Sequence, residues 1–542
     1  MKDTRFPERY YWVRMTELPH SVMLALGFAA LVILLTSLAR RLPIPTPILQ
    51  LAAGVAVGVF SREAIPTLDP DLVFFVFLPP VLWAAAYFTS LREFKQNIRS
   101  IGLLAIGLVI ATTAVVGVVA HALLPGMSWA VALALGAIVS PPDAVAAEAI
   151  IKRLPVPRRV LVILEGESLV NDASALVLYR TAVVAAVTGH FSMGEAVVRF
   201  FLDAAVGITV GVMVSWLAVA IARRSRDTLA LSLLSLVVPY AAWVAGEVLH
   251  VSAVLACVAG GIYARQHFSN VISPLARLQN RAVWDVLVFV TNALIFVLLG
   301  AAFGQLLTNT PGATLIHIGS VALGISGIVI LLRLVWVPIA AWLPRWLSRE
   351  VRERETPPAR KNVGLIAWTS MRGIVSLASA LALPLTIGDG SPFPWRTEIL
   401  LITMVVILIT LVVQGLTLAP LIRALRFPVD PMPHIEERHA RREALRDGLE
   451  RLEDLAQEEW VVPEELERLR EEYRRRSAFD IAREHDGGAA VSRRRLRAEL
   501  LRAERRAVVR LRDEGAISDE VLHELERELD VEALRIGAGE LG

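Results

Sequence analysis

The chain has 542 residues, of which 55% are hydrophobic, and its mean hydropathy is +0.56. Soluble domains are about 45–50% apolar, so this composition excludes an ordinary soluble globular protein. The single cysteine, Cys257, excludes a disulfide framework and a cysteine-rich metal site. The net charge of +3 gives no reason to expect a nucleic-acid partner.

The charged residues divide the chain at about Pro431. Residues 1–430 hold 33 Lys or Arg and 23 Asp or Glu, whereas residues 431–542 hold 22 and 29. The short second part is therefore much denser in charge, and its net charge is −7 against +10 for the first. This predicts an extracytoplasmic amino terminus over 1–19, a transmembrane domain over 20–430 and a helical tail in water over 431–542.

Residues 1–19 are polar and mixed in charge, which does not fit a cleavable signal peptide. Thirteen apolar segments follow, and most reach the ~20 residues that a helix needs to cross a bilayer. They are approximately 20–40, 45–60, 71–89, 100–122, 128–151, 160–187, 198–222, 228–249, 251–264, 284–306, 314–342, 362–386 and 397–425. The sequence predicts an all-α polytopic membrane protein.

Basic residues alternate between the loops. One set of loops carries 21 Lys or Arg, and the intervening loops carry only Arg62, Arg199 and Arg396. Because cytoplasmic loops are enriched in Lys and Arg, this pattern predicts a multi-pass protein of the inner (plasma) membrane with a cytoplasmic carboxyl terminus. Segments two (LAAGVAVG, 51–58) and nine (LACVAGGIYA, 255–264) are similar and lie seven segments apart, as inverted-topology repeats would.

Segment five is interrupted by Ser140-Pro-Pro-Asp143. Two prolines remove two amide donors and clash with the preceding turn, so a continuous helix is not expected. Irregular backbone at membrane depth is tolerated where it is buried or lines a cavity, and the amino terminus of a half-helix favours a carboxylate such as Asp143. A proline kink with a purely structural aspartate cap is the alternative.

Segment six contains Gly166–Ala173 (GESLVNDA), which sets Glu167, Ser168, Asn171 and Asp172 inside an apolar run. Ser168 and Asp172 share one helix face, and Glu167 and Asn171 share the next. Charged side chains are costly in hydrocarbon and usually face a cavity or a partner. The cluster predicts a site for a small cation or a proton, unless the helix begins later and leaves these acids in a loop.

Segment twelve contains Ser370-Met-Arg-Gly373, and a buried Arg372 needs a carboxylate partner. At 1.5 Å per residue, Glu167, Asp143, Arg372 and Asp172 lie roughly 10, 12, 15 and 18 Å from the cytoplasmic helix ends, so the four share one layer. Arg333 is a further intramembrane arginine, either a pairing charge or a side chain that extends to the cytoplasmic surface.

These three motifs, GESLVNDA, SPPDAVA (140–146) and MRGIVSL (371–377), resemble the sodium/proton exchanger family in its bacterial NhaP-like branch. The resemblance covers residues 20–425. It implies about thirteen helices in inverted repeats, two broken crossing helices and a homodimer of protomers with a moving ion-binding core. It implies no enzymatic activity and no cofactor.

The resemblance also implies roles for the motif residues. Asp172 would exchange Na⁺ for H⁺, with Asp143, Ser168 and the main chain at Pro142 helping to hold the ion. Glu167 and Arg372 would form a structural ion pair, and Asn171 would fix the crossing helices. An Asn at 171, in place of a second Asp, suggests electroneutral exchange.

Two departures from the family pattern leave the choice of ion open. Pro142-Asp-Ala144 lacks the threonine that often precedes the aspartate, and Leu78–Ala84 (LPPVLWA) lacks a glutamate that many members carry. The expected partners are Na⁺ or Li⁺, protons and membrane lipid, with a role in pH and sodium homeostasis. K⁺/H⁺ exchange is the nearest alternative, and a cation channel is the alternative of another class.

The tail predicts soluble helices. Residues 435–476 are rich in Glu and Arg, and 493–514 with 518–536 predict a helical hairpin with Ser518 as its amino-terminal cap. Solvated structural helices and a regulatory or dimer-supporting domain both stay open.

Overall fold

The computed structural model describes residues 20–41, 44–60, 70–152, 154–189, 193–225, 227–268, 271–354, 357–387, 390–428, 432–458, 460–482, 487–514, 516 and 518–536. The expected amino-terminal segment 1–19 lies outside the described residues. The chain divides into two compact units, Met1–Val429 and Asp430–Gly542, and each is described here by itself.

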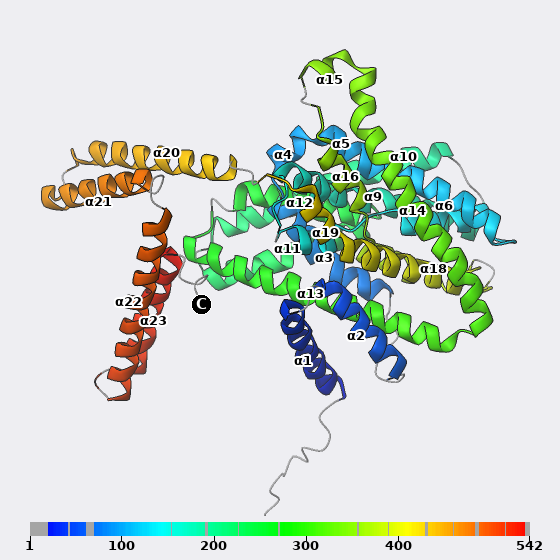
Figure 1. Cartoon of the computed structure of the whole chain (residues 1–542), viewed down its shortest axis with the longest axis horizontal. Helices are drawn as coiled ribbons and strands as arrows, with labels where there is room; N and C mark the ends of the chain where they lie inside the picture. Colours follow the sequence, from blue (N-terminus) through cyan, green and yellow to red (C-terminus); the bar gives the residue numbers. More distant parts are fainter. Residues whose placement is uncertain are drawn as a thin grey trace, which may run out of the picture. The chain divides into compact units, whose positions relative to one another are not determined.

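The regular secondary structure in the described residues of the membrane unit is helical, apart from one isolated bridge between Thr386 and Pro392. Figure 1 labels most of its elements, which are α1 (His20–Arg41), α2 (Thr46–Phe60), α3 (Pro70–Phe88), α4 (Leu91–Gln96), α5 (Ile98–Gly102), the π-helical η1 (Leu103–Leu108), α6 (Val109–Leu123), α7 (Trp129–Val139), α8 (Ala144–Ile151), α9 (Arg158–Thr188), α10 (Met193–Ala222), α11 (Thr228–Val248), α12 (Ala253–His267), α13 (Pro274–Asn309), α14 (Gly312–Leu347), α15 (Arg349–Arg354), α16 (Arg360–Trp368), α17 (Ile374–Leu381), α18 (Arg396–Ile409), the π-helical η3 (Thr410–Gln414) and α19 (Gly415–Leu425).

Each of the thirteen expected apolar segments coincides with one helix or with a series of short ones. Seven helical stretches among the described residues are long and apolar enough to cross a membrane: 98–123, 129–148, 201–222, 228–248, 276–309, 312–347 and 396–425. The structure is therefore that of an all-helical polytopic membrane protein. Helix α13 begins ten residues before its expected start, because residues 274–283 (PLARLQNRAV), which include two arginines and two amide side chains in an amphipathic run, continue the same helix.

Helices α2 and α13 form a close seam. A Cβ atom placed on Gly54 or Gly58 of α2 would collide with the carbonyl oxygens of Val297 or Ala301, and Gly300 and Gly304 of α13 approach α2 in the same way. The contacts advance by four residues along both helices, so the two run in the same direction. Small residues allow this backbone approach, as in many membrane helix pairs.

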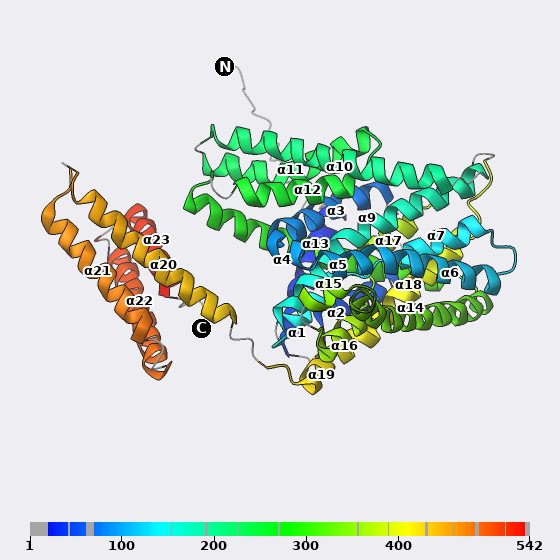
Figure 2. The same cartoon turned by 90° about the horizontal axis from the view of Figure 1, so that it is seen from above.

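Helices α10, α11 and α12 lie side by side, with α3 and α13 against them (Figure 2). Helix α12 is also rich in small residues, and its Gly260 packs against Ser215 of α10 and the ring of Trp83 of α3. Segments two and nine of the sequence thus both serve close helix packing.

Two helices are interrupted where they meet. The first breaks between α7 and α8 at residues 140–143, and the second breaks between α16 and α17 at residues 369–373. The Asp143 amide donates a hydrogen bond of 2.7 Å to the Met371 carbonyl, which joins the two breaks directly. We call this region the crossing.

The second unit consists of two pairs of packed helices, α20 (Met432–Leu455) with α21 (Pro463–Ala482) and α22 (Gly487–Asp513) with α23 (Asp519–Ile536). The predicted helical stretch 435–476 is interrupted near residue 460 and folds back on itself. The predicted Ser518 cap is confirmed, since its Oγ accepts from the Val521 amide at 3.3 Å.

Candidate functional site: the crossing and helix α9

The break at Pro141 and Pro142 exposes the carbonyl end of α7, and Arg372 covers it. Its Nε donates to the Val139 carbonyl at 3.0 Å and its Nη2 to the Ser140 carbonyl at 3.4 Å. Its Nη1 also donates to the carbonyl and hydroxyl oxygens of Ser370. A cation at the carboxyl end of a half-helix is favoured by the helix dipole, so Arg372 acts as the cap of α7.

Asp143 occupies the opposite position, at the amino ends of two half-helices. Its Oδ1 accepts from the Val145 amide at 2.8 Å and so caps α8. Its Oδ2 lies against Gly373, the residue before α17, where any Cβ atom would collide with the carboxylate. Only glycine at 373 leaves room for this carboxylate, which explains the arginine-glycine pair of segment twelve.

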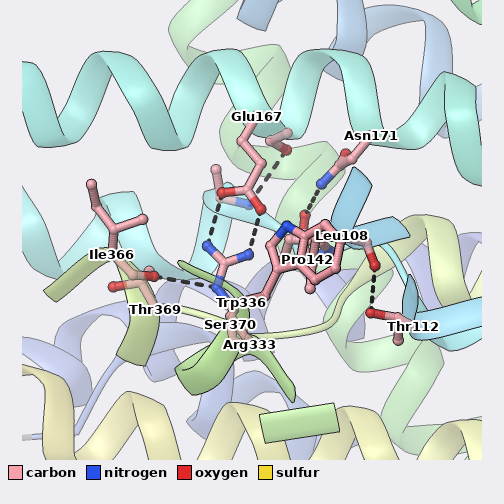
Figure 3. A network of polar contacts seen from close by, with 12 residues as sticks. Leu108, Thr112, Pro142, Glu167, Asn171, Arg333, Trp336, Ile366, Thr369 and Ser370 are labelled. Carbon is pink, nitrogen blue, oxygen red and sulfur yellow. Dashed lines mark hydrogen bonds and ion pairs between the residues drawn. The ribbon is translucent and has the colours of Figure 1, made fainter. Parts of the chain in front are cut away.

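Helix α9 joins the crossing through two polar side chains. The Asn171 amide donates to the Pro142 carbonyl at 2.9 Å, a bond visible in Figure 3, and the Ser168 Oγ accepts from the Ala144 amide at 3.5 Å. The structure therefore brings Ser168, Asn171, Pro142 and Asp143 together. It also leaves the Asn171 Oδ1 and Asp143 Oδ2 buried without a hydrogen-bond partner among the described residues.

Asp172 lies one turn beyond Ser168 on the same face of α9. It is 8% exposed, and no hydrogen bond or ion pair to it is found among the described residues. Asp143 is close enough for the two carboxylates to interact electrostatically. A buried charge without a partner is costly. Asp172 therefore needs a proton or a cation, and the unsatisfied oxygens of its neighbours are ligands that hard cations prefer.

Glu167 does not pair with Arg372, and that expectation is wrong. Its partner is Arg333 of α14, whose Nη1 and Nη2 donate to the two carboxylate oxygens, the second at 2.8 Å (Figure 3). Both side chains are 1% exposed. Arg333 completes its contacts by donating from Nε to the Ile366 carbonyl at 3.2 Å, so the pair fastens α9 to α14 and α16.

Two arginines at similar depth explain the wrong pairing. Counting residues from helix ends places Arg372 and Arg333 near Glu167 but cannot say toward which side of its helix each points. The signal for Arg333 was its position within an apolar run, where a charge needs a partner. The extension of Arg333 to the cytoplasmic surface is also excluded, because its side chain is buried.

The described residues contain no group of three or more His, Cys, Asp or Glu side chains that would hold a metal ion. The crossing instead offers two carboxylates together with hydroxyl, amide and main-chain oxygens. Carboxylate, hydroxyl and carbonyl oxygens are the ligands that hard cations prefer.

Comparison with known proteins gives the same family. Residues 27–424 match the model of the sodium/hydrogen exchanger transmembrane family. An uncharacterized Na⁺/H⁺ exchanger of Mycobacterium bovis is 34% identical over 528 residues, which is 95% of this chain and 96% of that protein. A sodium, potassium, lithium and rubidium/H⁺ antiporter of Bacillus subtilis is 31% identical over 93% of this chain and 78% of its own length.

The fold is similar to that of a solved sodium proton antiporter from Methanocaldococcus jannaschii, MjNhaP1. The TM-score is 0.57 at 21% identity, over 75% of this chain and 99% of that one. The expected family is therefore confirmed, and the channel alternative is set aside. The chain belongs to the sodium/hydrogen exchanger family and is a multi-pass membrane antiporter of monovalent cations and protons, not an enzyme.

Proposed function

We propose that Asp172 is the group at which a cation and a proton compete. The observation that carries this proposal is its burial without a hydrogen bond or ion pair among the described residues, beside Asp143. A proton that leaves the carboxyl group frees it to bind Na⁺, and Na⁺ that leaves frees it to take up a proton. Each side of the membrane then loads the ion that is in excess.

The bound ion is held by Asp172, Asp143 and the Ser168 hydroxyl, with the Pro142 carbonyl completing the set. Asn171 orients that carbonyl through its amide, and its own Oδ1 remains available to the ion. Glu167 with Arg333, and Arg372 at the end of α7, balance charge around the site but do not bind the ion. This assigns ion binding to the two carboxylates that have no ion-pair partner, together with two neutral oxygens, and structural roles to Glu167, Arg333 and Arg372.

The preferred ions are Na⁺ and Li⁺, and exchange is electroneutral because position 171 carries an asparagine and not a second aspartate beside Asp172. A K⁺/H⁺ exchanger is the second candidate, since the printed name of the Bacillus subtilis relative includes potassium. The membrane unit contributes about thirteen transmembrane helices in two inverted repeats. It works as a homodimer in the inner membrane, with its carboxyl-terminal tail in the cytoplasm.

The test uses the purified full chain in liposomes that contain a pH-sensitive dye. A pH gradient is imposed, the voltage is clamped with valinomycin, and Na⁺, Li⁺, K⁺ or choline is added. We expect Na⁺ and Li⁺ to drive proton movement that does not depend on voltage. In Asp172→Asn this movement falls to the choline background.

The matched control is Glu247→Gln, the same acid-to-amide change in the same unit. Glu247 is partly exposed and pairs with Arg180 at 2.9 Å, outside the crossing, so this variant should exchange at nearly the wild-type rate. An equal response to K⁺ would replace the Na⁺ assignment by the second candidate. Full exchange by Asp172→Asn would refute the role of Asp172.

A further inference from the structure

A hollow with a partly charged wall lies between α3, α10, α11, α12 and α13, and no residue of the crossing lines it. Three arginines and five aromatic side chains form much of its wall: Arg265, Arg277 and Arg281, with Trp83, Tyr87, Phe88, Phe268 and Trp284. The exchange mechanism uses none of these residues.

The hollow carries positive charge. The Arg265 guanidinium lies over the Tyr87 ring and that of Arg281 over the Phe88 ring, each 5.8 Å from the ring centroid. Such cation–π contacts help to hold a guanidinium in place. None of the described residues that line the hollow is acidic. An anionic group, and a phosphate above all, matches three arginines.

Asn280 shows that the ligand also needs a hydrogen-bond donor. Its side chain lines the hollow, is 8% exposed, and has an Oδ1 without a hydrogen-bond partner among the described residues. Leaving a buried acceptor unsatisfied costs about 1–3 kcal/mol. A ligand with a hydroxyl group beside its negative charge would satisfy Asn280 and the arginines together.

The remaining wall is apolar and reaches into the bundle. Ser215, at its inner end, lies seven residues before the end of α10, so the hollow extends roughly 10 Å inward from the helix ends. Ala218, Val219 and Ile272 continue the apolar lining. The ligand that fits is thus amphipathic, with a polar end at the helix termini and a hydrocarbon part between the helices.

We infer that this hollow binds a phospholipid whose headgroup carries a phosphate and free hydroxyls, for which phosphatidylglycerol is the simplest example. The arginines hold the phosphate, Asn280 accepts from a headgroup hydroxyl, and the aromatic wall contacts the acyl chains. The hollow opens at the end of the membrane unit whose loops are basic, where anionic headgroups are attracted. The bound lipid fastens α3 to α12 and α13.

The test is native mass spectrometry of the purified, delipidated full chain after addition of phosphatidylglycerol or phosphatidylethanolamine. We expect one tightly retained phosphatidylglycerol per protomer and much weaker retention of phosphatidylethanolamine. In Arg277→Gln/Arg281→Gln, retention should fall by about tenfold or more. The control Arg223→Gln/Arg224→Gln removes two exposed charges from the same end of the unit but outside the hollow, and should retain the lipid.

A second variant separates charge from hydroxyl recognition without removing an arginine. Asn280→Ala should lose the preference for phosphatidylglycerol over phosphatidic acid, which has no headgroup hydroxyls, while it still binds both. Free glycerol phosphate and inorganic phosphate should not displace the lipid; displacement by either would mean that the site takes a soluble anion. Equal retention by the double arginine variant and the wild type would overturn the proposal.

Discussion

The α2–α13 seam and the crossing, both in the membrane unit, differ in how their backbone hydrogen-bonding groups are satisfied and in whether they can bind an ion. At the seam, two continuous helices satisfy their own backbone hydrogen bonds, and glycines let them touch. At the crossing, two helices are interrupted, and side chains such as Arg372 and Asp143 satisfy the freed backbone groups. The seam leaves no space for an ion, whereas the crossing keeps buried oxygens without partners.

This difference shows where rigidity and ion binding each reside. Backbone contact along a seam tolerates almost no displacement, because interiors are close-packed. A crossing stabilised by side-chain hydrogen bonds can exchange one partner for another, including an ion. The contrast predicts that changes at the seam affect stability and that changes at the crossing affect transport. The buried ion pair between α9 and α14 should affect stability as the seam does.

The largest expected effect is the loss of stability on breaking the Glu167–Arg333 pair. Removing one partner of a buried pair leaves an uncompensated charge and typically costs about 3–5 kcal/mol. We therefore expect Arg333→Met to lower the thermal unfolding temperature of the purified protein strongly. Glu167→Gln/Arg333→Met should recover much of that loss, because neither charge remains.

Measuring the thermal unfolding temperature of Arg372 variants distinguishes Arg333 from Arg372 as the partner of Glu167. In a double-mutant cycle, Glu167 should couple strongly to Arg333 and far less to Arg372, which donates to main-chain carbonyls and to Ser370. A larger coupling to Arg372 would restore the pairing expected from the sequence.

The next effect is steric and belongs to the seam. Gly58→Ala places a methyl group against the Ala301 carbonyl, and overpacking of this kind typically costs about 1–3 kcal/mol. Gly319→Ala in α14 is the control, because its Cβ would meet no atom within 4 Å, and it should unfold at or slightly above the wild-type temperature. Equal unfolding temperatures for the two variants would contradict the seam.

A smaller effect, confined to transport, is expected for Asp143→Asn. The amide oxygen still accepts from Val145 and preserves the cap of α8, but one negative charge leaves the ion site. The apparent KM for Na⁺ in liposomes should rise by about tenfold with little change in unfolding temperature. Asp143→Ala should add a loss of stability of about 1 kcal/mol, since it also removes the cap. An unchanged KM in Asp143→Asn would exclude this carboxylate from the site.

The smallest effect is expected on removing the second unit. Asp430–Gly542 forms its own compact unit, so a chain that ends at Val429 should still fold and exchange cations for protons in liposomes. Its initial rate should stay within about twofold of the full chain, a change below 1 kcal/mol in activation free energy. Complete loss of exchange would show that the tail is required for transport itself.

Much of the fold could be predicted because the membrane restricts it to long apolar helices. The two breaks were also predictable, one from Pro141-Pro142 and the other from a charged, glycine-containing motif. The π-helical segment η3 was not, although its Thr410 accepts from the Arg372 amide at 3.1 Å and supports the crossing. Nothing in the apolar sequence around Thr410 indicates an extra residue in the helical turn.

The site could be predicted only in part, because a helix position gives depth and not direction. The GESLVNDA motif pointed to Ser168, Asn171 and Asp172, and the contacts of Ser168 and Asn171 with Ala144 and Pro142 follow from the prolines that free the backbone there. The partner of Glu167 depended on how α14 is rotated about its axis, which a long apolar helix with one arginine does not reveal. The position of Asp143 against Gly373 likewise required the crossing itself.

The ion pair between α9 and α14 also determines how late in synthesis the charge of Glu167 is balanced. Glu167 and Arg333 are 166 residues apart, and ribosomes add roughly 5–20 residues per second, so Glu167 waits roughly 8–33 s for its partner. A lone carboxylate in lipid costs several kcal/mol, so during this interval Glu167 either carries a proton or remains hydrated in the insertion machinery. The first half of the nascent membrane unit therefore reaches its final charge balance only when the second half emerges.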